Sequence, residues 1–373
     1  MKKIHDLLTS GETTEVLGGG LLSEFGGMPF SVFDARQGWW QTRKKAWLSL
    51  GIKSELGRGE NLLKFSDTAL DGNKLSRAGD SAYVPQTGVK RHAHRAIPGG
   101  GTGKNSVWLF KTKEGYVSAS KQKSGRLTFG TSKMPSALNT LSGTSIFDPV
   151  LCELVYRWFV PQGGTILDPF AGGSVRGLIA AMLGYRYCGI DLSGEQVEAN
   201  KTQAAALLSE DKPFPKWIQG DSTEVVSLSG GKRVDAIFTC PPYADLEVYS
   251  DHPKDISGMS YADFAKTFSR IIENSCGLLK NNRFACVVIG DVRDKKTGFY
   301  RGLPALTTEI FEKAGLHLYN TAILLTSVGS LAMRTRRMFN ASRKLGTTHQ
   351  YVLVYVKGDP LKAVKALGGF LND

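Results

Sequence analysis

Cysteines and long apolar runs are both scarce in this sequence, and each shortage excludes a class of protein. The 373 residues include five cysteines, an odd number with no CxxC pair, which fits neither a disulfide framework nor a zinc site. No window of about 18 residues is both apolar and uncharged, which excludes a transmembrane helix. The first residues, Met1-Lys2-Lys3, lead into charged positions rather than an apolar stretch, so we expect no secretory signal. We therefore expect a reduced, soluble protein of the cytoplasm that binds no structural metal.

Acidic residues are also in short supply. The 34 Asp and Glu residues stand against 47 Lys and Arg, for a formal net charge of +13. Between Gln86 and Lys133 ten residues are basic and one is acidic, and three of the basic ones are candidate nucleic-acid contacts: Lys90, Arg91 and Arg95. Such a surplus indicates a polyanionic partner, because each neutralised phosphate releases counterions. Charge alone leaves solubility as an equal alternative.

The length predicts two units, and the sequence changes character near residue 135. Residues 1–135 are rich in Gly, Ser, Lys and aromatic residues and contain a predicted hairpin over 106–110 and 115–119. We expect this basic, aromatic-containing region to be a candidate for recognition of the target. A regular α/β domain over 136–358 follows, and 359–373 form a short tail.

Apolar strand patterns alternate with helical ones from about residue 145 onward. Strands are predicted over 165–168, 187–191, 217–220, 236–239, 284–290, 319–325 and 350–356. Helices are predicted over 148–159, 174–183, 193–208, 261–280 and 303–314. The alternation predicts a Rossmann-like parallel sheet covered on both faces, and the last two strands, with no helix expected between them, predict an antiparallel end. Seven strands arranged in this way resemble the S-adenosylmethionine-dependent methyltransferase fold.

The strongest motif follows the first strand of this domain, where an acid and a glycine turn precede a helix. The segment reads Asp168, Pro169, Phe170, Ala171, Gly172, Gly173. Open parallel sheets bind ligands beside such a turn, and its glycines let the backbone approach a ligand closely. The carboxylate of Asp168 would repel a pyrophosphate but suits the cationic methionine end of S-adenosylmethionine.

Acids also follow the next two strands. Asp191, with Leu192 behind it, can accept hydrogen bonds from two ribose hydroxyls, or it can cap the next helix together with Ser193. Asp221, followed by Ser222, can hold an adenine amino group or form a simple turn.

Two prolines stop the fourth strand abruptly. The segment reads Cys240, Pro241, Pro242, Tyr243. The prolines remove two backbone donors and leave carbonyl oxygens as acceptors, and an aromatic ring directly after them can stack on a planar base. A packed tyrosine after a Pro-Pro turn is the simpler alternative.

Together, the 168–173 and 240–243 segments resemble the exocyclic-amino DNA methyltransferases, which modify adenine N6 or cytosine N4. Residues 145–149, which contain Phe147 and Asp148, resemble a further cofactor-contacting segment of that family. The resemblance covers about 140–357, and residues 29–58 resemble a segment of phage-encoded DNA modification proteins. It implies S-adenosylmethionine as cofactor, double-stranded DNA as partner, catalysis by the 136–358 domain and a place in a bacterial or phage-infected cytoplasm. It also implies that a flipped base stacks on Tyr243 while residue 240 and the Pro241 carbonyl orient its amino group, with no metal.

Two positions depart from the family pattern. Gly172-Gly173-Ser174 replaces the more usual Gly-x-Gly, and Cys240 replaces an acidic, amide or hydroxyl residue. A thiol is a weak acceptor, and its shape is nearest to serine, which favours cytosine N4. A nucleophilic role for Cys240, as in cytosine-C5 enzymes, would require the Pro-Cys order that this sequence does not have.

No target-recognition domain is inserted between Asp168 and Cys240, because the predicted strands and helices occupy that whole stretch. Besides residues 1–135, the segment between the last two strands is basic and free of acids from 331 to 346, with Arg334, Arg336, Arg337, Arg343 and Lys344. These side chains can contact phosphates or guanine edges, or they can form a solvated loop. Trp39, Trp40 and Trp47 can stack on bases or form a small core. An RNA methyltransferase and a DNA-binding protein on a weakened methylase scaffold remain alternatives.

Overall fold

The computed structural model describes residues 30–53, 107–112, 115–121, 127–130, 147–246, 248–328 and 331–368. These residues fall into two units: segments 30–53 and 147–368 form the larger one, and the strands within 107–130 belong to the smaller one. The predicted boundary at residue 135 is therefore wrong for residues 30–53. They belong to the α/β domain because their strand and helix pack on it.

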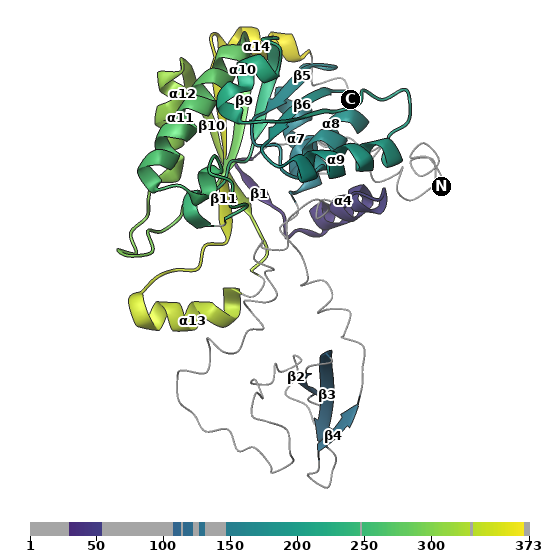
Figure 1. The fold of residues 1–373 in the computed structure, drawn as a ribbon, viewed down its shortest axis with the longest axis vertical. Helices are drawn as coiled ribbons and strands as arrows, with labels where there is room; N and C mark the ends of the chain where they lie inside the picture. The colour runs from purple at the N-terminus through teal and green to yellow at the C-terminus, as the bar shows by residue number, and fades with distance from the viewer. Residues whose placement is uncertain are drawn as a thin grey trace. The chain divides into compact units, whose positions relative to one another are not determined.

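A mixed sheet of eight strands forms the centre of the larger unit (Figure 1). In spatial order the strands are β1 (Val32–Asp34), β10 (Leu316–Leu325), β11 (His349–Lys357), β9 (Leu279–Ile289), β8 (Val234–Thr239), β5 (Thr165–Asp168), β6 (Arg186–Asp191) and β7 (Lys216–Gln219). All seven strands predicted in this domain are present, and β1 is added at the edge.

The direction of the strands fixes where a ligand can bind. Strand β5 pairs parallel with β6 and β8, while β11 runs antiparallel to both β9 and β10, which confirms the predicted antiparallel last strand. From β5 the chain continues to β6 and β7 on one side, then returns to the other side with β8. The topological switch therefore lies between β5 and β8. Ligands of open α/β sheets bind outside the carboxyl ends of the strands at such a point.

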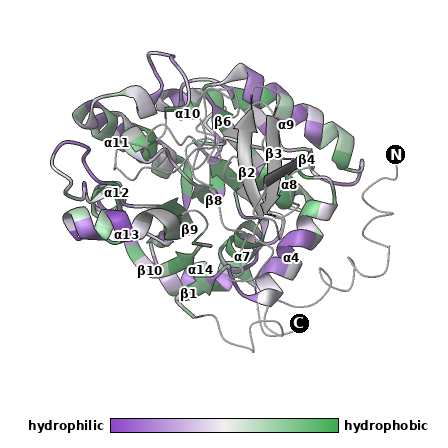
Figure 2. Ribbon diagram, turned by 90° about the horizontal axis from the view of Figure 1, so that it is seen from below, coloured by the Kyte–Doolittle hydropathy of each residue, from purple (hydrophilic) through white to green (hydrophobic). Residues whose placement is uncertain are grey.

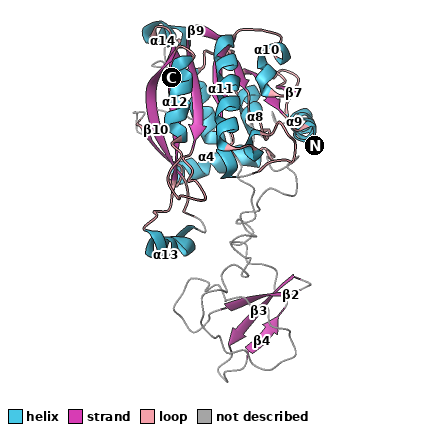
Figure 3. Cartoon of the chain, turned by 60° about the vertical axis from the view of Figure 1, so that its left-hand side comes forward, coloured by secondary structure: helices cyan, strands magenta, loops and turns pink. Residues whose placement is uncertain are grey.

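Two helical layers cover the sheet, and alternate residues of each strand face opposite layers. One layer consists of α4 (Gly38–Ser49), α7 (Pro149–Phe159), α8 (Val175–Met182), α9 (Gly194–Leu207) and α14 (Pro360–Leu367). The other consists of α10 (Val225–Leu228), α11 (Tyr261–Leu278) and α12 (Leu303–Lys313), of which α11 and α12 lie side by side in Figure 3. In β5, Ile166 packs in the first layer and Leu167 in the second. In Figure 2 the strands of the large sheet are mainly green, while the helices around them combine green with purple segments.

Helix α4 joins the domain through a buried ion pair. Arg43 donates to both carboxylate oxygens of Glu153 on α7, each over 2.7 Å, and both side chains are fully buried. Trp47 donates to the same carboxylate over 2.8 Å. Trp40 and Trp47 are buried in the core, so the structure agrees with a core role for these two tryptophans rather than base stacking.

The smaller unit contains a three-stranded antiparallel sheet of β2 (Val107–Thr112), β3 (Gly115–Lys121) and β4 (Leu127–Gly130). The pairing of β2 with β3 confirms the predicted hairpin. Lys90, Arg91 and Arg95 lie outside the described residues.

Besides α4, three helices of the larger unit are not among those predicted. The segment between β10 and β11 contains helix α13 (Leu331–Ser342), visible in Figure 1 beyond the ends of these strands, and the tail contains α14, which begins at the capping residue Asp359. Residues 225–228, between two predicted strands, form α10. Among the residues that the structure describes, no helix is long and apolar enough to cross a membrane.

Candidate active site

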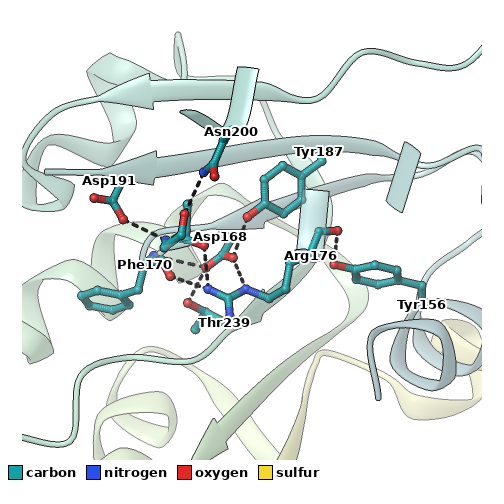
Figure 4. A network of polar contacts seen from close by, with 10 residues as sticks. Tyr156, Asp168, Phe170, Arg176, Tyr187, Asp191, Asn200 and Thr239 are labelled. Carbon is teal, nitrogen blue, oxygen red and sulfur yellow. Dashed lines mark hydrogen bonds and ion pairs between the residues drawn. The ribbon is translucent and has the colours of Figure 1, made fainter. Parts of the chain in front are cut away.

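The carboxylate of Asp168, at the end of β5, is completely buried and bonded on both oxygens (Figure 4). Its Oδ1 accepts hydrogen bonds from Thr239 Oγ1 over 2.6 Å and from the Phe170 backbone N–H over 3.2 Å. Its Oδ2 accepts from Tyr187 Oη over 2.7 Å and from Arg176 Nε over 2.5 Å. The expectation that this carboxylate faces a cationic ligand is therefore wrong, since protein groups surround it.

Arg176 neutralises Asp168 and also holds the turn that follows it. The guanidinium Nη2 donates to the Phe170 carbonyl over 2.6 Å and to the Ala171 carbonyl over 2.9 Å. The guanidinium also lies over the Phe147 ring, whose centroid is 4.5 Å away. Burial lowers the pKa of Arg176, but the Asp168 carboxylate raises it, and the net shift is upward, so this guanidinium stays charged. Sequence reasoning missed Arg176, although an arginine just after a glycine turn was a usable signal.

The glycine turn needs a left-handed residue at Gly172, whose φ is +50°. The Gly172 N–H donates to Asp191 Oδ2 over 2.8 Å, and its carbonyl accepts from Asn200 Nδ2 over 2.7 Å. Groups from β6 and α9 therefore fix the turn from both sides. Ser174 adds a third link, since its hydroxyl donates to Gln203 of α9 over 3.0 Å.

Asp191, at the end of β6, is half-buried beside this turn. Its second oxygen accepts from the Ser193 N–H over 2.9 Å, while Ser193 itself caps α9 through the Gln196 N–H. The helix cap is therefore Ser193, and Asp191 joins the end of β6 to the glycine turn. Burial raises the pKa of Asp191, and the two backbone hydrogen bonds lower it by less.

Residues after β7 tie a third strand end to the same place. The Ser222 hydroxyl donates to the Pro169 carbonyl over 2.5 Å. Asp221 caps the short 3₁₀ helix Ser222–Glu224 through the Thr223 N–H and pairs with Lys254 over 3.1 Å. Burial raises the pKa of Asp221, but hydrogen bonds from Thr223 and Lys254 outweigh it, so the net shift is downward. Asp221 is thus ionised at neutral pH.

The Cys240–Tyr243 segment leaves β8 next to this turn. Pro241 is buried, while Cys240, Pro242 and Tyr243 are half-buried. The Cys240 Sγ lies 3.6 Å from Tyr243 Oη. Strands β8 and β5 are joined here, since Thr239, at the end of β8, donates to Asp168, at the end of β5.

Two residues that sequence reasoning missed position the Tyr243 side chain. Gln350 at the start of β11 donates through Nε2 to Tyr243 Oη over 2.7 Å. Gly290, directly after β9, lies against the ring, where an added Cβ would be 3.0 Å from Tyr243 Cε2. A glycine at the end of a predicted strand was a signal for close approach, but no sequence pattern points to Gln350.

Phe147 and Asp148, which were predicted to contact the cofactor, directly precede α7, and Asp148 contacts α4. The carboxylate of Asp148 caps α7 through the Val150 N–H and accepts from Trp40 Nε1 over 3.2 Å and Lys44 Nζ over 3.0 Å. Phe147 is half-buried between Arg176 and Phe238.

The basic residues near the end of the chain lie on or just after α13. Arg336, Arg337 and Arg343 are exposed, Lys344 is half-buried, and Arg334 is placed in the helix by its backbone. The connection that contains α13 starts at the carboxyl end of β10, the same edge of the sheet as Asp168 and Cys240, because β10 and β8 run in the same direction.

No protein-family model matches this sequence, and no curated protein matches it. Solved structures of similar fold were found. TrmN from Thermus thermophilus is 16% identical over 62% of this chain and 56% of its own, with a TM-score of 0.39. Magnesium protoporphyrin IX methyltransferase from Synechocystis PCC 6803, with S-adenosylhomocysteine bound, is 13% identical over 57% of this chain and 81% of its own (TM-score 0.37). A TehB-like SAM-dependent methyltransferase from Corynebacterium glutamicum is 17% identical over 60% of this chain and 94% of its own (TM-score 0.35). The match spans little more than half of TrmN.

Proposed function

We propose that this protein transfers a methyl group from S-adenosylmethionine to the exocyclic amino group of a base flipped out of duplex DNA. One observation carries the proposal: the glycine turn after β5 and the Cys240–Tyr243 segment after β8 leave neighbouring strands at the switch point of the sheet. The hydrogen bond from Thr239 to Asp168 joins their bases. A cofactor on the turn and a base on Tyr243 would therefore lie next to each other.

Residues at the carboxyl ends of β5, β6 and β7 fit the cofactor. The half-buried turn at Gly172 presents backbone without a side chain. Each oxygen of Asp191 accepts one N–H, which leaves an acceptor site on each oxygen for a ribose hydroxyl. Asp221 is ionised and can accept from an adenine amino group. When bound, S-adenosylmethionine supplies an electrophilic methyl group on a sulfonium.

Asp168 acts in this proposal as a positioning residue. Its pair with Arg176 is neutral overall, so the turn carries no bare negative charge. Arg176 in turn fixes two carbonyl groups of the turn. The network therefore sets the shape of the cofactor site without touching the cofactor.

Tyr243 and Cys240 fit the base. The Tyr243 ring is fixed at its hydroxyl by Gln350 and at its edge by Gly290, so it can serve as a preformed stacking surface. Pro241 and Pro242 have no N–H groups, so this segment offers mainly acceptors to an amino group. Acceptors at Cys240 and the Pro241 carbonyl orient the amino nitrogen, and catalysis then comes from positioning and electrostatics. Because the Cys240 thiol is nearest in shape to serine, we propose cytosine N4 before adenine N6.

The experiment that tests this proposal measures transfer of isotope-labelled methyl from S-adenosylmethionine to unmodified DNA and to RNA, followed by nucleoside mass spectrometry. Label in N4-methylcytosine or N6-methyladenine of DNA is the expected result and identifies the base. Label in RNA alone would replace the DNA substrate by RNA. Absence of label from both, with the cofactor bound, would contradict the proposed transfer.

A further inference from the structure

A short hairpin follows β9 and presents the most exposed large hydrophobic side chain among the described residues. Arg293 and Tyr300 form an antiparallel bridge, and the Asp294 N–H donates to the Phe299 carbonyl over 2.9 Å. The Phe299 side chain, next to this turn, is 75% exposed. We call residues 295–300 the hairpin tip.

The base of the hairpin is firmly held. Asp291 Oδ1 accepts from the N–H groups of Gly302 and Leu303 at the start of α12, over 3.0 and 3.2 Å. Arg301 pairs with Asp294 over 3.1 Å, and its guanidinium lies 4.5 Å from the centre of the Tyr261 ring. An apolar group on such a fixed base loses little conformational freedom when it binds a partner.

The charges of the tip favour a polyanion. Lys295 and Lys296 are exposed, and the Arg293 guanidinium stacks on Tyr300 at 3.7 Å. The two acids of the hairpin are engaged at its base, Asp291 with backbone N–H groups and Asp294 with Arg301. A third lysine lies close by, because a Cβ at Gly298 would stand 2.6 Å from Lys344 Nζ. The hairpin that carries the exposed ring is therefore rich in cations, a combination suited to bases and phosphates together.

The tip lies at the same sheet edge as the candidate active site. Gly290, which packs against the Tyr243 ring, directly follows β9, and Arg293 opens the hairpin shortly afterwards. A few extended residues reach about 10 Å, roughly the distance of a few stacked base pairs. A duplex whose base occupies the Tyr243 ring would thus pass near the tip.

We propose that the hairpin tip is a wedge that enters the base stack of duplex DNA beside the flipped base. Phe299 stacks in the space opened in the duplex, and Lys295 and Lys296 contact the flanking phosphates. Apolar side chains inserted between base steps open a duplex in this way, and they offset the loss of base stacking. The proposal rests on the proposed function for the choice of DNA, and it adds the element that opens the duplex.

A binding experiment tests the wedge without requiring methyl transfer. Phe299→Trp is compared with Phe214→Trp, since Phe214 is also exposed, at 55%, but precedes β7 at the opposite edge of the sheet. With a mixed-sequence DNA duplex, we expect quenching of the added tryptophan emission in Phe299→Trp and none in Phe214→Trp. DNA binding without quenching in Phe299→Trp would overturn the wedge. Quenching by duplex RNA but not by DNA would overturn the choice of partner.

A transfer experiment then separates the wedge from the chemistry. Plasmid DNA that carries no modification is first incubated with the wild-type protein, and the methylated sites are mapped. Duplexes of the mapped sequence are then made with either a normal base or an abasic position opposite the target base. Phe299→Ala should lose about 10-fold in transfer to the paired duplex and regain most of it on the abasic duplex, where the target is already unpaired. Phe214→Ala should match the wild type on both. Equal loss on both duplexes would overturn the wedge, whereas absence of wild-type transfer would overturn the proposed function and leave the fluorescence result to judge the wedge.

Discussion

The two segments that meet at the switch point are held in opposite ways. The glycine turn is fixed by a buried network in which Asp168 alone has four hydrogen-bond partners. The Cys240–Tyr243 segment is half-buried except for Pro241, and Gln350 and Gly290 position its ring at the hydroxyl and at the edge. Substitutions in the glycine-turn network should therefore change mainly the stability of the fold. Substitutions in the Cys240–Tyr243 segment should change mainly the rate of methyl transfer.

Asp168→Ala should give the largest effect on stability. It leaves the buried Arg176 charge without its carboxylate, so the free energy of unfolding should fall by about 3–5 kcal/mol. Chemical denaturation measures this loss. The double variant Asp168→Ala/Arg176→Met should lose less than the single one, because no unpaired charge remains. A single variant as stable as the wild type would mean that the network is not structural.

Tyr243→Ala should do the reverse and spare the fold. Loss of stacking on one base costs about 1–3 kcal/mol, so methyl transfer should fall about 5- to 150-fold while S-adenosylmethionine affinity stays unchanged. Tyr243→Phe keeps the ring but loses the Gln350 hydrogen bond, and its rate should fall about 2- to 10-fold. Single-turnover kinetics and calorimetry measure the two quantities. Equal rates for the alanine variant and the wild type would place the base elsewhere.

Gly172→Ala sharpens the comparison because a matched control exists. Gly172 and Gly163 both have positive φ, +50° and +65°, but Gly163 lies before β5 at the other edge of the sheet. Alanine at either position should cost about 1–2 kcal/mol of stability. Gly172→Ala alone should also weaken S-adenosylmethionine binding, as calorimetry would show. Similar affinity in both variants would separate the turn from the cofactor.

A smaller effect concerns Asp191 at the end of β6 and Asp221 just after β7. Their pKa values are shifted in opposite directions from the ordinary value of 3.8. The raised pKa of Asp191 means that its stability contribution is present below the unfolded value and lost as pH rises through the folded one. Asp221, whose pKa is lowered, contributes stability above the unfolded value and loses it as pH falls through the folded one. As pH falls, Asp191 therefore protonates first.

Affinity for S-adenosylmethionine should accordingly fall on acidification at a pH above that of an ordinary aspartate. Calorimetric titration at a series of pH values measures this affinity. Asp191→Asn should abolish the decrease in affinity at the higher pH, whereas Asp221→Asn should retain it. An unchanged profile in Asp191→Asn would remove Asp191 from the cofactor site.

Local patterns predicted most of the α/β domain. The strand that ends at Asp168 and the turn through Gly172 follow from an apolar run and glycines, which act within a few residues. Strand β1 was missed because three residues carry too little periodicity, and its place depends on an edge formed by β10. Helix α13 was missed because its arginines predict solvent rather than a packed face.

The sequence by itself determined the order of seven strands and five helices, the two motifs at the switch point and the surplus of positive charge, because each depends on neighbouring residues or on composition. The tertiary structure alone decided which groups meet. Asp168 is buried against Arg176 rather than open to a ligand, Tyr243 bonds with Gln350 from a distant strand, and Arg43 finds Glu153. Such partners depend on how strands pair and helices pack, so they are set by the global arrangement of the sheet and not by any local pattern.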